Sequence, residues 1–137
     1  MDVGRNLDPP VRWVRAYWNE PDLIGPPADG LGGSKMEFLY ELTAKGYVLR
    51  SIELMGEDLV PVGASSLAEF WEAQEYRHQA STPALLKHEN RYGRVPEGSE
   101  ADWGDFPHDE ITAEEFERSW AVSRAHLSET PRSDHFA

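Results

Sequence analysis

The first half of the chain alternates hydrophobic and polar positions with a period of two, which is the spacing of a half-buried β-strand. The alternation is clearest over residues 36–42 and 47–55, which a short turn joins. We expect two more strands over 11–19 and 59–64, and Pro61 favours a sheet edge because proline lacks a backbone donor. In the second stretch the pattern places one set of apolar side chains on a single face, namely Val48, Ile52 and Leu54.

From residue 66 onward the spacing of apolar residues becomes that of a helix. Ser66 and Glu69 form a capping box, which predicts a helix over 67–77. A proline in a first turn and a glycine ten residues later predict a second helix over 83–92.

The strongest helix signals lie over 113–127. Thr112 and Glu115 form another capping box, and Ile111 is placed to pack on Phe116 as a hydrophobic staple. The expected buried stripe of this helix consists of Phe116, Trp120, Ser123 and Leu127.

Strands followed by helices predict an α+β fold, with an antiparallel sheet of about four strands and two or three helices packed on one face. We expect residues 11–127 to form a single domain, 1–10 a poorly ordered leader and 128–137 a polar tail. A loop over 21–35 holds three prolines and four glycines, and its length indicates a mobile or functional segment.

Composition narrows the class of protein. The 137 residues are 39% hydrophobic, which is enough to build a core. The absence of cysteine excludes disulfides and thiolate catalysis. Neither a signal-like N-terminus nor an apolar run of membrane-spanning length is present, so we expect a cytoplasmic protein of bacterial type.

Charge changes the picture most. The formal net charge is −12, of which −2 falls in residues 1–56 and −10 in 57–137. Between residues 95 and 117 there are nine carboxylates and no lysine or arginine. This distribution argues against binding to nucleic acid or to an anionic membrane, and it favours a basic protein partner.

We therefore expect an acidic interaction protein, such as an inhibitor of immunity or antitoxin type that covers a basic surface. Two aromatic residues in the acidic stretch are candidate anchors, because tryptophan is enriched among interface hot spots. The expected partner-binding residues are Glu100, Asp102, Trp103, Asp105, Phe106 and Asp109.

An alternative is a small enzyme or ligand-binding protein with a pocket beneath loop 21–35, which would act as a lid. The candidate pocket residues lie on strand faces or beside the acidic stretch: Trp13, Arg15, Tyr17, Glu37, Arg50, Glu53 and His108. With 25 carboxylates the sequence does not single out a catalytic pair.

The sequence does not match the known motifs of phosphate-binding and metal-binding sites, because the order or spacing of the residues differs. Gly33-Ser34-Lys35 has the wrong order for a phosphate-binding loop and precedes a strand instead of a helix. No two of the five histidines stand four residues apart, and the acidic stretch lacks the alternating oxygens of a calcium loop. We expect no metal and no cofactor.

Several structural motifs resemble a group of small acidic bacterial domains of unknown function. The motifs are the tryptophan-rich strand over 11–18, the segments 40–42 and 46–53, and the helix start over 110–120. The resemblance spans roughly residues 11–127 and implies a fold without implying an activity or a site residue.

Overall fold

A computed structural model describes residues 8–18, 36–74, 81–96, 98–103 and 108–135. Loop 21–35 and most of the expected leader lie outside these residues, as do Asp105 and Phe106. The described elements, in chain order, are β1 (Arg12–Trp18), β2 (Met36–Leu42), β3 (Val48–Met55), β4 (Val60–Ser66), α2 (Leu67–Gln74), α3 (Ser81–Tyr92), the 3-10 helix η2 (Glu100–Trp103), β5 (His108–Ile111), α4 (Ala113–Glu129) and α5 (Arg132–His135).

The strands form one antiparallel sheet in the order β4-β3-β2-β1-β5, which confirms the expected α+β fold. The sheet has one strand more than the four expected. The additional strand, β5, pairs with β1 and consists of His-Asp-Glu-Ile. Its composition hides it from sequence patterns, because acidic residues are depleted in strands and the segment has a single apolar side chain. At the other edge, β4 carries Pro61, as predicted.

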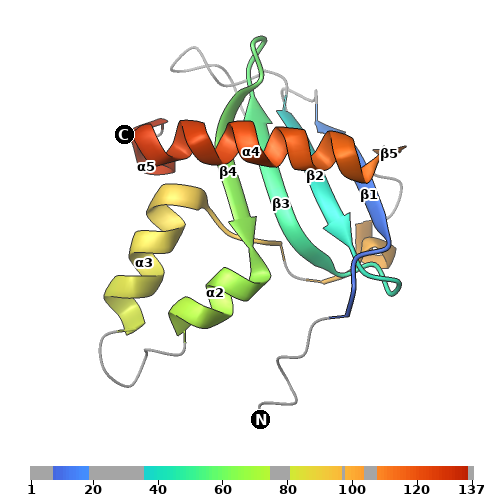
Figure 1. Cartoon of the computed structure of the whole chain (residues 1–137), viewed down its shortest axis with the longest axis horizontal. Coiled ribbons are helices and arrows are strands. Elements are labelled where there is room, and N and C mark those ends of the chain that lie inside the picture. Colours follow the sequence, from blue (N-terminus) through green and yellow to red (C-terminus); the bar gives the residue numbers. More distant parts are fainter. Residues whose placement is uncertain (1–7, 19–35, 75–80, 97, 104–107, 136–137) are drawn as a thin grey trace.

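Helix α4 crosses one face of the sheet, while α2 and α3 lie beside the β4 edge (Figure 1). We call the covered side the α4 face. Its core is a buried cluster of Leu39, Ile52 and Phe116, against which Trp13 and Trp120 pack. On the opposite face the buried clusters are Val14, Leu42 and Val48, and Met36, Met55 and Val62.

The predicted position of Val48 is wrong. The strand register shifts between Glu41 and Leu42, so the alternation of β3 does not run unbroken from its first residue. Val48 therefore packs with Leu42 on the opposite face, whereas Ile52 stays on the α4 face. A bulge of this kind moves a side chain to the other side of a sheet without a clear mark in the sequence.

The predicted start of α4 is confirmed, and so are three of the four residues of the expected buried stripe, whereas Trp120 is only half-buried. The Oγ1 atom of Thr112 accepts a hydrogen bond from the Glu115 backbone N–H at 3.0 Å, as a capping box requires. Phe116, Ser123 and Leu127 are buried along the helix. No helix in the described residues is long and apolar enough to span a membrane.

The end of the chain holds a further helix, α5, in the segment expected to be a polar tail. Its Arg132 donates a hydrogen bond to the Val62 carbonyl at 2.9 Å and lies 3.2 Å from a carboxylate oxygen of Glu53. These contacts fasten α5 to the two strands at the β4 edge.

Candidate functional site

Three arginines in the sheet each bridge two carboxylates. In every case one carboxylate is the more buried of the two, and the other comes from β5 or α4. We call this set the arginine network, and its members are Arg12, Arg15 and Arg50 with Glu37, Glu41, Glu100, Glu110, Glu115 and Glu117.

Arg50 is the most enclosed of the three. Its Nε and Nη2 donate to the two carboxylate oxygens of Glu41 at 2.8 and 2.7 Å, and it also bonds to Glu117. The guanidinium lies 4.9 Å from the ring centroid of Phe116 and 4.8 Å from that of Trp120. Burial opposes the charged form, but the carboxylate hydrogen bonds outweigh it and raise the pKa of Arg50.

Glu41 is held from a second side. Its side chain is only 8% exposed, and it accepts a hydrogen bond from the Trp13 indole N–H at 3.1 Å. A buried carboxylate needs such partners, because an unpaired charge in the protein interior is costly. Trp13 and Arg50 are therefore part of the structural support of Glu41, and not a pair of groups lining an open pocket.

Arg15 joins β1 to α4. Its Nη2 lies 2.6 Å from a Glu115 oxygen, and its Nε lies 3.1 Å from a Glu37 oxygen. On the same face, the Tyr17 hydroxyl donates to Asp109 at 3.1 Å. These contacts occupy the middle of β1 on the α4 face.

Arg12 closes the network at the other end of β1. It binds Glu100 through both nitrogens of its fork, and its Nη2 lies 2.6 Å from Glu110. The hydrogen bond from Arg12 is the main cause of a lowered pKa at Glu100, which also lies 2.9 Å from the His108 Nε2 atom. Glu100 and His108 are thus tied to the sheet edge.

The residues expected to line a ligand pocket are divided between the two faces of the sheet. Strand alternation and pairing place five of them on the α4 face: Trp13, Arg15, Tyr17, Glu37 and Arg50. Glu53 and His108 lie on the opposite face. The seven side chains therefore do not converge on one cavity.

Of the residues expected to bind a partner, the structure describes the side chains of Glu100 and Asp109. Glu100 is engaged with Arg12, whereas Asp109 is exposed on β5. Asp102 and Trp103 lie in η2, with side chains outside the description.

On the α4 face, Asp109 belongs to a group of acidic side chains, most of which were not among the expected partner-binding residues. They come from β5 and the first half of α4, and three of the four are exposed. We call this surface the acidic corner, and it consists of Asp109, Glu114, Glu115 and Glu117. Glu110 lies on the opposite face of β5, the face of His108, and so is not part of it.

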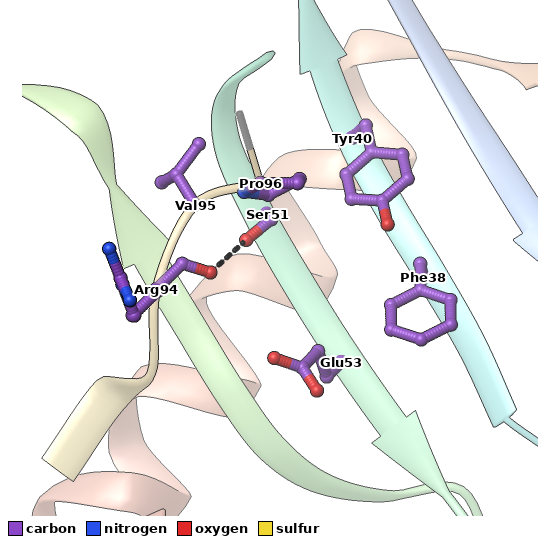
Figure 2. Close-up of a pocket in the computed structure, with 7 residues that line it drawn as sticks. All are labelled: Phe38, Tyr40, Ser51, Glu53, Arg94, Val95 and Pro96. Carbon is purple, nitrogen blue, oxygen red and sulfur yellow. Dashed lines mark hydrogen bonds between the residues drawn. The ribbon is translucent and has the colours of Figure 1, made fainter. Parts of the chain in front are cut away.

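An open groove of about 640 Å³ lies on the opposite face, where residues 94–96 run beside β3 (Figure 2). The rings of Phe38 and Tyr40 stack with centroids 6.0 Å apart, and burial raises the pKa of Tyr40. Ser51 donates to the Arg94 carbonyl at 3.4 Å, and Glu53 is paired with Arg132. The polar groups of this groove thus hold its own walls together.

Among the residues described, no three histidine, aspartate or glutamate side chains gather as metal ligands would. Comparisons with protein-family models, curated proteins and solved structures find no match for this chain. Any function assigned to the chain therefore rests on its own residues.

Proposed function

We propose that this chain is an interaction protein that binds a basic protein surface through the acidic corner. The observation that carries the proposal is the charge left over at this corner. On the α4 face, the corner with Glu37 and Glu41 holds six carboxylates against the two guanidinium groups that bind them, those of Arg15 and Arg50, an excess of four. Each guanidinium is already shared between two carboxylates, so cations of a partner would find negative charge that the chain itself does not neutralise.

The exposure of the acidic side chains at the corner also supports this proposal. Asp109, Glu114 and Glu117 are exposed, and the last has a side chain 56% exposed in spite of its bond to Arg50. Exposed charges of one sign raise the association rate of a partner of the opposite sign. An inhibitor of immunity or antitoxin type would use such a surface to cover the functional site of a basic protein.

Preorganisation supports it as well. Glu117 is held by Arg50, and Asp109 by the Tyr17 hydroxyl. Side chains fixed before binding lose less conformational entropy when a partner arrives. The corner therefore presents these two carboxylates at set positions before a partner arrives.

The test is capture of partners from host lysate at low salt, with three forms of the full chain. Asp109→Lys with Glu114→Lys reverses the corner, whereas Glu72→Lys with Glu129→Lys makes the same change of net charge at exposed helix positions elsewhere. We expect mass spectrometry to identify a basic protein that the wild type and the Glu72/Glu129 variant retain and the corner variant loses. Equal retention by all three forms, or equal loss in both variants, contradicts the proposal.

A further inference from the structure

A second groove, of about 580 Å³, lies between α4 and the β3–β4 hairpin. The tip of this hairpin projects beyond α4 (Figure 1). Leu54, Val60 and Pro61 line the groove from the hairpin side, and Val122 lines it from the helix. The volume falls in the range of small-molecule sites, and apolar walls with few polar groups are typical of them. We call it the hairpin groove.

Two features mark the hairpin groove as more than a gap between elements. Val122 is 65% exposed, which is unusual for a large apolar side chain beside other apolar groups. Leu59, in the turn, has a φ of +50°, a backbone conformation that residues other than glycine rarely adopt. That turn is closed by a hydrogen bond from the Leu59 N–H to the Gly56 carbonyl at 3.1 Å, which holds Leu59 at the groove wall.

Ser123 adds a polar group without a partner. It lines the groove and is only 1% exposed, and its Oγ has no hydrogen-bond partner among the described residues. Buried hydroxyls are nearly always bonded, and on helices serine commonly bonds to the carbonyl four residues earlier. An unsatisfied hydroxyl at this position is suited to a ligand that brings its own hydrogen-bonding atom.

Arg118 adds an unneutralised charge at the rim. In the described part of the chain it is the one arginine for which the structure gives no ion pair or hydrogen bond. Asp58 stands in the hairpin turn on the other side, and no ion pair joins the two. His126, half-buried on α4, completes the charged or titratable groups of the lining. In a chain of net charge −12, a cation left unpaired beside an apolar groove is a specific feature.

We propose that the hairpin groove binds a small amphipathic carboxylate. Its apolar part lies between the hairpin and Val122, its carboxylate pairs with Arg118, and the Ser123 hydroxyl donates to it. A charge-assisted hydrogen bond of this kind is among the stronger polar contacts, and the apolar wall contributes through burial. Asp58 repels the same head group and so sets the orientation of the ligand. The site is independent of the acidic corner, and neither proposal depends on the other.

Octanoate is the probe, and octylammonium is its matched control, because the two share a tail of similar length and differ in the sign of the head group. Each is titrated into the full chain while backbone amide shifts are followed by two-dimensional NMR. We expect octanoate to give saturable shifts at residues 59–61 and 118–123, and octylammonium to bind at least about fivefold more weakly. Equal binding of the two probes overturns the proposal, since it shows only partition of the tail.

Four variants sharpen the test. Arg118→Gln and Ser123→Ala are each expected to weaken octanoate binding, the first by about fivefold. Lys45→Gln removes one positive charge at an exposed site in the β2–β3 turn and is expected to leave binding unchanged. Asp58→Asn is expected to strengthen binding, because it removes the opposing carboxylate. Affinity unchanged in both Arg118→Gln and Ser123→Ala, or a loss in Lys45→Gln equal to that in Arg118→Gln, overturns the assignment.

The thermal midpoint of each variant shows whether a loss of octanoate binding comes from the groove or from unfolding. Arg118 and Asp58 are exposed, so their variants should keep the thermal midpoint of the wild type. Val122→Glu places a charge in the apolar lining at a largely exposed position, so it should also fold and should lose octanoate binding by tenfold or more. Retained binding in a folded Val122→Glu variant contradicts the position of the tail.

Discussion

Replacing Arg50 with methionine tests whether the arginine network holds the fold together. Methionine keeps much of the apolar length of the arginine stem but removes the guanidinium. The substitution leaves Glu41, whose side chain is 8% exposed, with the Trp13 indole as its remaining hydrogen-bond donor. It also removes a cation that lies within 5 Å of the centroids of Phe116 and Trp120.

The expected cost follows from these contacts. Removing one partner of a fully buried ion pair costs about 3–5 kcal/mol, because the other charge is stranded. The Arg50 side chain is 19% exposed, so solvent reduces this to about 2–3 kcal/mol. Loss of the two ring contacts adds about 0.5–1 kcal/mol, partly offset by the packing of methionine. We expect Arg50→Met to lower the free energy of unfolding by about 3 kcal/mol.

Urea unfolding followed by tryptophan fluorescence measures this loss. Glu117→Gln is the matched control: it removes the exposed partner of the same guanidinium, and we expect it to cost less than about 1 kcal/mol. Adding Glu41→Gln to Arg50→Met should recover part of the loss, since the stranded charge is then gone. A cost below about 1 kcal/mol for Arg50→Met, or no recovery in the double variant, contradicts a stabilising role of the Arg50–Glu41 pair.

Three further predictions concern stability. Gly93→Ala should cost more than Gly56→Ala in urea unfolding. Both glycines have a φ of +86°, but a Cβ at Gly93 would lie 3.3 Å from Arg132 Cδ, whereas a Cβ at Gly56 would meet no other described residue beyond its chain neighbours within 4 Å. Equal costs would contradict this. Thr112→Ala should lower the free energy of unfolding by about 1 kcal/mol through loss of the α4 cap, while Thr112→Ser keeps it. Burial lowers the pKa of His88, so the folded state favours neutral imidazole. The stability it contributes is present above the unfolded pKa near 6.5 and is lost as the pH falls below that value; His88→Gln should flatten the unfolding free energy over this window, and an unchanged profile would contradict it.

Most elements of the fold can be predicted from patterns of residues that are close together in the sequence. The period-two stretch over 36–42 coincides with β2, and the capping box at Thr112 marks the start of α4. Such signals are readable because they depend on residues a few positions apart. The features that escaped prediction are those without a local mark, such as the polar strand β5 and the register shift after Glu41.

The candidate site depended on contacts between distant parts of the chain. Arg12 and Glu110 are 98 residues apart in sequence, and Arg15 and Glu115 are 100 apart. In these pairs, arginines of the first half neutralise carboxylates of the second. No spacing rule reveals such pairs. Sequence alone therefore showed where the acidic residues gather, but not which of them are used internally.

Strand alternation likewise predicts the positions of the pocket candidates only in part. Alternation along a strand puts Trp13, Arg15 and Tyr17 on a common face, and the structure has them there. What it did not show is which face α4 covers, or that Glu53 lies on the other side of the sheet. That choice depends on how a helix far along the chain packs, and not on the strand itself.

We propose that the acidic corner binds a basic protein, and this binding should depend strongly on salt. The most direct measurement is the association rate of the captured partner at about 50 and 300 mM salt, for the wild type and for the corner and Glu72/Glu129 variants. We predict that the wild-type rate falls at least tenfold between the two salt concentrations, that the corner variant associates slowly at both, and that the Glu72/Glu129 variant follows the wild type. A rate insensitive to salt, or the same loss in both variants, would contradict the claim.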